Sequence, residues 1–214
     1  MTRDITSTSS VVGSLGARAL RWVLGVVLIF CSCSPALSRS SPGSDAPDAQ
    51  RLEEQNLDHF TDLPVLTHEG REVRFYSDLL KGRRAIISFF YVNCPTVQPA
   101  LLSLFKLQRE LGEKMGDEIV FLTLSVDPER DDLAAVQEYA RRYNPGRGWY
   151  FITGRRSSMD VINRRLGNTL KLPEGHLRLF LMGNLRTGHW MRLVETAPAR
   201  ALKEGLGSLE EKVF

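Results

Sequence analysis

The stretch RAIISFFYVNCPTVQPAL, residues 84–101, runs an apolar segment directly into a cysteine that is followed by two prolines. An unbroken run of β-branched and aromatic residues is typical of a strand that is buried on both faces of a sheet. The prolines suit the start of a helix, whose first amides have no partners inside the helix. The pattern therefore predicts a strand over 84–92, then Cys94, then a helix over about 97–115.

Two further apolar runs follow, EIVFLTLSV at 118–126 and GWYFIT at 148–153, with helical patterns between them. Buried strands that alternate with helices indicate a parallel sheet that is covered on both faces. Near the C-terminus, segments 176–182 and 189–195 are joined by a short loop, which predicts an antiparallel pair at the edge. The fold class predicted is thus α/β, a thioredoxin-like mixed sheet with central parallel strands and an antiparallel C-terminal edge pair, flanked by helices. The later helices are expected at about 132–143, 157–167 and 198–212.

The composition of the 214 residues, 43% hydrophobic and 25% charged, is that of one globular domain with an appendage. The net charge is +3, and no basic stripe is interleaved with aromatic residues, so a nucleic-acid partner is not expected. The chain also has neither GxxxxGK[ST] nor GxGxxG after a strand, which argues against a phosphate-binding loop.

The N-terminal segment has the features of an export signal. Arg18 and Arg21 precede the apolar run 22–30, and no further charge appears until Arg39. Residues 1–38 are therefore predicted to be a signal peptide or an N-terminal membrane or lipid anchor. Residues 39–60 are predicted to be a flexible linker, and 61–214 the thioredoxin-like domain.

Two processing patterns compete within this segment. Phe30-Cys31-Ser32-Cys33 approximates a lipoprotein box in which Cys33 would be lipidated, whereas residues 36–38 offer a small-x-small cleavage site. The apolar run is close to the shortest that spans a bilayer. Each outcome predicts an exported, extracytoplasmic protein, either membrane-anchored, a lipoprotein facing the periplasm, or cleaved and soluble there.

The cysteine count isolates one thiol. Cys31 and Cys33 lie in the targeting segment, so Cys94 is alone in the predicted domain and cannot form an internal disulfide. A helix N-terminus stabilises a thiolate over a thiol, which favours a functional Cys94 over one that only packs. Gln98 would share its helical face if the turn is helical, with about 5–6 Å between Cβ atoms. Its amide is a weak ligand at most, and a solvated glutamine is an equally good interpretation.

The segments FFYVNCPTVQP, FLTLSVDPERDD and FITG, with a histidine just before the last strand pair, together resemble the Sco/SenC family. That family consists of thioredoxin-fold proteins that handle copper during assembly of the copper A site of cytochrome c oxidase. The resemblance covers about residues 63–195. It implies a copper site formed by Cys94 and His176, with Gln98 where the family has its second cysteine. Gly175 also stands where the family has an aspartate.

Two other positions bear on the site. Asp127 follows the strand at 118–126 and opens the acidic segment 127–132, so capping and turn formation explain this cluster first, with a supporting electrostatic role near the thiol second. His189 is not expected to be a co-ligand, because a 176–182/189–195 hairpin would place it roughly 20 Å from His176.

The function predicted is that of a Sco-like copper-binding protein that assists oxidase assembly through a reduced site of one cysteine and one histidine. Cu(I) is favoured because it is soft and prefers thiolate, while Cu(II) is possible. The expected partner is an oxidase subunit or another copper acceptor. Intramolecular dithiol chemistry is excluded because no resolving thiol is present. Two alternatives remain open: a monothiol redox or peroxidase-like protein, and a docking module that has lost its site.

Overall fold

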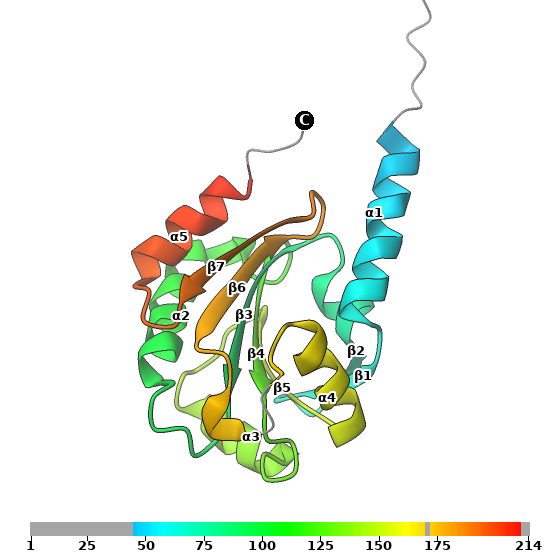
Figure 1. Cartoon of the computed structure of the whole chain (residues 1–214). Coiled ribbons are helices and arrows are strands. Elements are labelled where there is room, and N and C mark those ends of the chain that lie inside the picture. The colour runs from blue at the N-terminus through cyan, green and yellow to red at the C-terminus, as the bar shows by residue number, and fades with distance from the viewer. Residues whose placement is uncertain (1–44, 170–171, 211–214) are drawn as a thin grey trace, which may run out of the picture. The chain divides into compact units, whose positions relative to one another are not determined.

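A seven-stranded mixed sheet forms the centre of the protein (Figure 1). The computed structural model describes residues 45–169 and 172–210. The strands lie in the order β2-β1-β5-β4-β3-β6-β7. Their bounds are β1 Pro64–Thr67, β2 Glu72–Arg74, β3 Arg84–Phe90, β4 Ile119–Ser125, β5 Trp149–Thr153, β6 Leu179–Asn184 and β7 His189–Val194.

The strand directions confirm the predicted thioredoxin-like arrangement. β3 and β5 both run parallel to β4, and β6 and β7 form an antiparallel pair beside β3. Every residue of β3 and of β4 is buried, as their continuous apolar sequences indicate. At the other edge, β1 and β2 form a hairpin, and β1 pairs antiparallel with β5.

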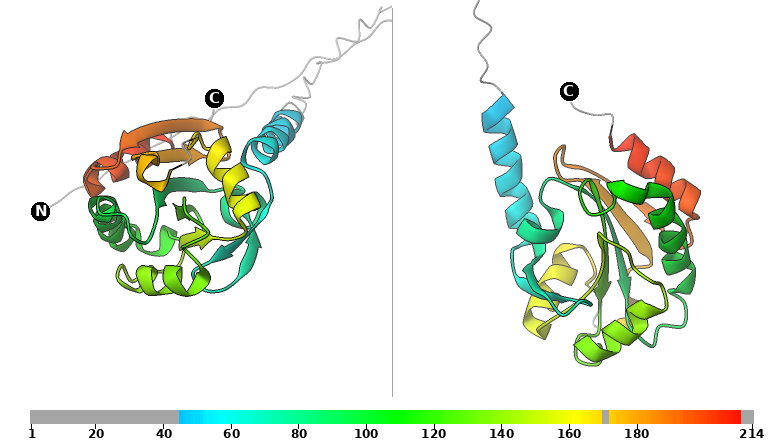
Figure 2. Two further views of the ribbon diagram at one scale, coloured as in Figure 1. Left: turned by 60° about the horizontal axis from the view of Figure 1, so that its bottom comes forward. Right: turned by 180° about the vertical axis from the view of Figure 1, so that it is seen from behind.

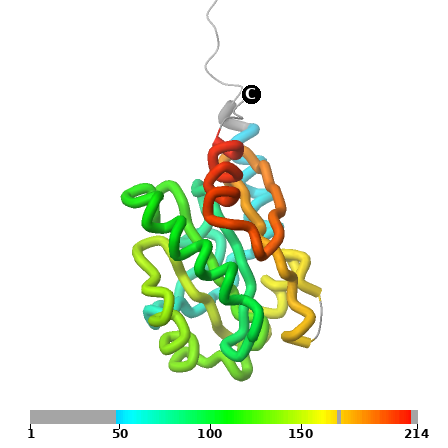
Figure 3. The backbone as a smooth tube through the Cα atoms, turned by 90° about the vertical axis from the view of Figure 1, so that its left-hand side faces the viewer, coloured from blue at the N-terminus to red at the C-terminus, as the bar shows by residue number. Residues whose placement is uncertain are grey.

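Helices cover both faces of this sheet (Figure 2). α2 and α5 lie together on one face, which is turned toward the viewer in Figure 3. α1 and α4 lie on the other face, together with a short π-helical segment over Phe75–Leu80. The bounds of the helices are α1 Asp45–Phe60, α2 Gln98–Leu111, α3 Leu133–Arg141, α4 Arg156–Arg165 and α5 Ala199–Ser208.

Alternate residues of the central strands supply two separate apolar cores. Ile86 and Phe90 pack in the core beneath α2, α3 and α5, and Ile87 and Phe89 pack in the core beneath α1 and α4. This division follows from the period of two in a strand, which sends neighbouring side chains to opposite faces. Because the two cores hold β3 and β4 from both sides, the loops that leave these strands start from fixed points.

The prediction of a flexible linker over 39–60 is wrong for residues 45–60, which form α1. Two contacts near the C-terminal end of α1 anchor it to the domain, and the polar composition of the segment did not indicate them. Asn56 donates a hydrogen bond to the carbonyl of Leu185 at 2.9 Å, and the Phe60 ring lies 5.1 Å from that of Trp190. Tertiary packing, rather than helix propensity, stabilises such a segment.

The predicted targeting segment 1–38, including Cys33, lies outside the described residues. In the portions 45–169 and 172–210, no helix combines the length and apolar content required to cross a bilayer.

Candidate metal centre

The carboxyl ends of β3 and β4 lie side by side. The two strands are parallel and in register, with Phe90 opposite Ser125, and the amide of Val126 donates to the carbonyl of Phe90 at 2.9 Å. The loop that leaves β3 carries Cys94, and the loop that leaves β4 carries Asp127. Open α/β sheets bind ligands at this edge, so the fold places both predicted residues where a site is expected.

Cys94 lies in a non-helical turn rather than in the first turn of α2. Its amide donates to the carbonyl of Tyr91 at 2.9 Å, and α2 begins at Gln98 with Val97 as its N-cap residue. The cysteine is buried, with 7% of its surface exposed. It therefore lies at the margin of the apolar core beneath α2, where its contacts decide whether the sulfur only packs.

The sulfur meets the imidazole of His176. Sγ of Cys94 lies 3.5 Å from Nε2 of His176, although the two residues are 82 positions apart. His176 directly follows the short 3-10 turn Pro173–Gly175, and only 4% of its surface is exposed. The fold thus brings together the two residues that the family resemblance implied as partners.

The histidine has a defined orientation. Its Nδ1 lies 3.0 Å from the carbonyl oxygen of Leu177. A carbonyl can only accept, so this contact assigns the imidazole proton to Nδ1. With the proton on Nδ1, the lone pair of Nε2 faces the sulfur of Cys94, which is the arrangement that a metal-binding imidazole requires.

Two further side chains surround the pair. Oγ1 of Thr96 lies 3.5 Å from Sγ of Cys94, and the ring of Tyr91 meets that of His176 edge to face, with 5.9 Å between centroids. Burial raises the pKa of the Tyr91 phenol, and the neighbouring Cys94 and Glu174 raise this pKa further. The phenol therefore stays protonated beside the sulfur over the physiological range.

The spacing of sulfur and nitrogen fits two ligands of one metal ion. With metal–sulfur and metal–nitrogen distances of about 2.3 and 2.0–2.1 Å, taken from zinc sites, a tetrahedral angle separates the two donors by about 3.5 Å. Thiolate and imidazole are also ligands that copper accepts. No group of three or more His, Cys, Asp or Glu side chains arranged to hold a metal ion occurs among the described residues. The candidate centre consequently has two such donors, Cys94 and His176.

Gln98 does not lie on a helical face with Cys94. The prediction required a helical turn through both residues, and the turn over 94–97 is not helical. Gln98 is instead the exposed first residue of α2. Its position agrees with the solvated glutamine considered above.

The carboxylates of the acidic segment after β4 have different partners. Asp132 caps α3, accepting a hydrogen bond from the amide of Ala135 at 2.8 Å, so capping explains part of the cluster as predicted. Asp127 pairs with Arg130 at 3.3 Å. The supporting role suggested for Asp127 at the thiol has no direct contact to carry it.

Asp131 is a residue that sequence reasoning missed. Its two carboxylate oxygens accept from the amide of Val92 at 3.0 Å and from the hydroxyl of Ser125 at 2.6 Å. Burial raises its pKa, although both hydrogen bonds oppose the shift. Asp131 thereby ties the loop of Cys94 to the end of β4. Its place within a run of acidic residues gave no sign that this carboxylate, unlike its neighbours, is buried.

His189 lies at the other end of the hairpin, as predicted. It pairs with Asn184 across β6 and β7, is exposed, and contacts Thr187 at 3.1 Å. The β6 strand separates it from His176, which precedes that strand.

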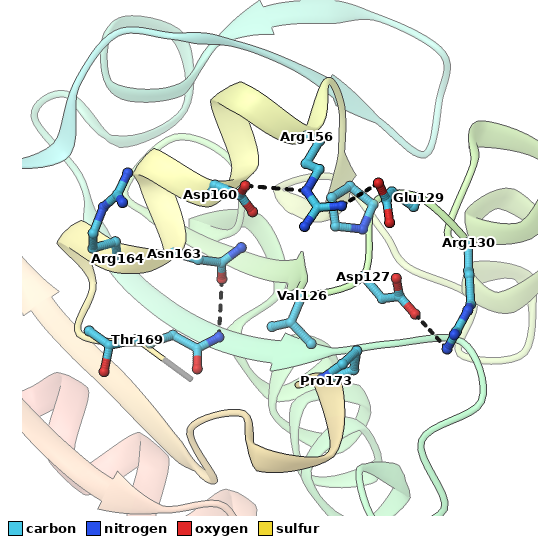
Figure 4. Close-up of a pocket in the computed structure, with 12 residues that line it drawn as sticks. Val126, Asp127, Glu129, Arg130, Arg156, Asp160, Asn163, Arg164, Thr169 and Pro173 are labelled. Atoms are coloured by element: carbon cyan, nitrogen blue, oxygen red, sulfur yellow. Dashed lines mark hydrogen bonds and ion pairs between the residues drawn. The ribbon is translucent and has the colours of Figure 1, made fainter. Parts of the chain in front are cut away.

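A polar cleft of about 590 Å³ adjoins the centre without including either donor (Figure 4). Arg156 pairs with Glu129 and, at 3.5 Å, with Asp160 across one part of it. Pro173, which begins the turn before His176, forms another part of its wall. The cleft and the candidate metal centre therefore share one loop.

Known proteins resemble this chain in sequence and in fold. The SCO1/SenC family profile matches residues 51–170. A SCO2-like protein of Rickettsia conorii is 28% identical over 109 residues, which are 51% of this chain and 52% of the relative. The mitochondrial SCO2 homologue of Bos taurus is 34% identical over 86 residues, covering 39% and 32% of the two chains. The matched segments thus span about half the length of the first relative and less of the second.

Solved structures agree in fold. A SCO1/SenC family lipoprotein from Bacillus anthracis superposes with a TM-score of 0.58 at 19% identity, over 70% of this chain and 93% of that one. Arabidopsis thaliana ScoI, solved with copper bound, gives a TM-score of 0.56 at 20% identity, over 69% and 95%. Since the family profile covers more than half of the sequence and the folds agree, this chain belongs to the SCO1/SenC family.

Proposed function

We propose that this protein is a Sco-like copper-binding protein that assists assembly of the copper A site of cytochrome c oxidase, and that it uses a reduced site of one cysteine and one histidine. The observation that carries the proposal is the 3.5 Å contact between Sγ of Cys94 and Nε2 of His176. Copper is the cargo of such a protein, which passes it on to an acceptor.

The chemistry of the two donors supports Cu(I) as the favoured form. Cu(I) is soft and binds thiolate, while imidazole serves either oxidation state, so Cu(II) is also accommodated when water or another oxygen completes the site. A site with one thiolate holds copper less tightly than one with two. Delivery needs only a gradient of affinity toward the acceptor, so a weaker site is still useful for transfer.

The family supports an oxidase subunit, or another copper acceptor, as the partner. An exported location, with the N-terminal segment as signal or anchor, would place the domain on the side of the membrane where copper A sites are assembled. This location rests on the sequence of residues 1–38 alone, through the basic residues that precede the apolar run.

Copper loading of the purified protein tests the proposal. Under reducing conditions, we expect the wild-type chain to retain about one Cu(I) after desalting against a weak competing ligand. The double variant Cys94→Ala/His176→Ala should retain none. Equal retention by both proteins would place any bound copper elsewhere and refute the proposed site.

A monothiol redox function is the second candidate, because the thiol contacts an imidazole that can accept its proton. Peroxide would convert the Cys94 thiolate to a sulfenic acid, releasing water after protonation. One external thiol would then form a mixed disulfide and release water, and a second would free Cys94 and leave as the external disulfide. The burial of Cys94 opposes access by peroxide. A peroxide-consumption assay with a thiol reductant separates the candidates: consumption well above that of free cysteine would favour the redox function.

A further inference from the structure

Both halves of the Cys94–His176 pair are tied to one residue, Ser125, which ends β4 and is fully buried. The first connection runs toward the cysteine. The hydroxyl of Ser125 donates to Asp131 at 2.6 Å, and Asp131 accepts from the amide of Val92 at 3.0 Å. This connection ends two residues before Cys94.

The second connection runs toward the histidine. Asn163 donates from Nδ2 to the carbonyl of Ser125 at 3.0 Å, and Asn168 donates from Nδ2 to Oδ1 of Asn163 at 3.3 Å. Oδ1 of Asn168 accepts from the amide of Leu177 at 3.1 Å. The carbonyl of Leu177 in turn accepts a hydrogen bond from Nδ1 of His176 at 3.0 Å. Asn163 and Asn168 are each 7% exposed. Water therefore does not readily replace these hydrogen bonds.

We propose that Asn168 is the positioning residue that sets the imidazole of His176 against the sulfur of Cys94. Removal of its side chain leaves the Leu177 amide and the Asn163 carbonyl oxygen without their partners, and burial makes that loss costly. The loop would move to recover hydrogen bonds, carrying the histidine with it. The role of Asn168 in orienting His176 does not depend on the proposed function, whereas its effect on copper binding rests on that function.

The end of α4 would remain in place without this side chain. The backbone amide of Asn168 donates to the backbone carbonyl of Asn163 at 2.8 Å, and Asn168→Ala keeps this bond. Gly167, with φ of +86°, completes the chain reversal after the helix. We therefore expect Asn168→Ala to change the position of residues 176–177 and to leave the end of α4 intact.

Three variants of the full chain test the proposal. Asn168→Ala removes both side-chain bonds. Asn168→Asp keeps an acceptor for the Leu177 amide but cannot donate to Asn163 as an ionised carboxylate. Thr169→Ala is the matched control, because Thr169 is the exposed neighbour in the same loop.

The first measurement needs no metal. Nitrogen-15 NMR of histidine-labelled, copper-free protein reports which imidazole nitrogen carries the proton. We expect the Nδ1–H form of His176 in the wild type, in Thr169→Ala and in Asn168→Asp. In Asn168→Ala this signature should be lost, because the carbonyl of Leu177 no longer holds the ring.

The second measurement is the dissociation constant for Cu(I) by competition titration. Loss of an outer hydrogen bond to a metal ligand typically weakens metal binding by about 10–100-fold, and we expect this loss in Asn168→Ala. Thr169→Ala should stay within about twofold of the wild type, a change too small to indicate a lost hydrogen bond. If Asn168→Ala does not fold, Asn163→Ala takes its place, since alanine favours the helix and still breaks the connection.

The two measurements distinguish failure of this proposal from failure of the proposed function. An Asn168→Ala protein that keeps both the Nδ1–H signature and the copper affinity of Thr169→Ala overturns the positioning role. If no protein, including the wild type, binds copper but the NMR signature still depends on Asn168, the copper function fails and the positioning role stands.

Discussion

The candidate metal centre and the polar cleft beside it are neighbours of opposite character. The cleft is wide, and its arginines at 130 and 156 already face carboxylates. The centre is buried, and its two donors, Cys94 and His176, lie 3.5 Å apart. Exposed ion pairs are screened by water, whereas a buried thiol and imidazole keep strong directional interactions. We therefore expect metal binding at the desolvated, oriented donors of the centre rather than in the larger cleft.

Replacement of the sulfur should reduce the Cu(I) affinity of the centre more than any other substitution, while changes in the cleft should not affect it. Cys94→Ser exchanges a soft thiolate donor for a hard hydroxyl, and we expect Cu(I) affinity to fall by more than about a hundredfold, or roughly 3 kcal/mol. The measurement is a Cu(I) competition titration. Arg156→Ala, which changes the cleft alone, is the control and should bind copper like the wild type. A loss of affinity in the cleft variant as large as that of Cys94→Ser would erase the distinction between the two regions.

Removal of the imidazole should have the next largest effect. His176→Ala leaves the thiolate as the single strong donor, and we expect Cu(I) affinity to fall by about tenfold or more, which is at least about 1.4 kcal/mol. His189→Ala is the matched control, because His189 is the exposed histidine at the far end of the hairpin. Equal effects of the two substitutions would show that the buried histidine has no special part in binding.

Addition of a second thiol at the centre should strengthen its Cu(I) binding, the opposite of the two substitutions above. Gln98→Cys places a thiolate four residues after Cys94, and we expect Cu(I) binding to tighten by about tenfold, because a soft ion prefers sulfur to an amide. The same titration reports the change. Since the turn over 94–97 is not helical, the new thiol must turn toward the centre to act. An unchanged dissociation constant would mean that the two side chains do not converge.

The smallest effect concerns the buried carboxyl that holds the loop of Cys94. Burial raises the pKa of Asp131 above 3.8, so the protonated form of this carboxyl is more favoured in the folded chain than in the unfolded chain. Stability from this group is complete below the unfolded pKa and is lost as the pH rises through the higher folded pKa. We expect the free energy of unfolding of the wild type, relative to Asp131→Asn, to decrease from about pH 4 upward. Urea unfolding at several pH values measures this difference, and a difference that increases with pH would contradict the assignment.

The sequence predicts the centre of the sheet better than its margins. The apolar runs of β3 and β4 are continuous because both faces are buried, and such runs read as parallel strands without further information. β1 has only four residues, too few to establish a period. α1 is polar along its length, and the contacts of Asn56 and Phe60 that anchor it come from remote parts of the chain.

The site likewise has one residue that its local sequence identifies and others that it does not. Cys94 could be identified from its position after a buried strand, whereas His176 came from the family resemblance, because no local pattern reports a contact across 82 residues. The asparagines that support the histidine left only faint signals. Asn163 is a poor helix former inside α4, and Asn168 follows the glycine that ends the helix turn. Both signals become meaningful only when the fold shows which buried groups these amides reach.

X-ray absorption at the copper edge tests the central claim most directly, because it identifies the atoms bound to the metal. In the copper-loaded protein, we predict one sulfur and at least one imidazole nitrogen in the same coordination shell, with the sulfur lost in Cys94→Ser and the imidazole scattering lost in His176→Ala. A shell of oxygen and nitrogen alone, or one that neither substitution changes, would contradict a copper site built from these two residues.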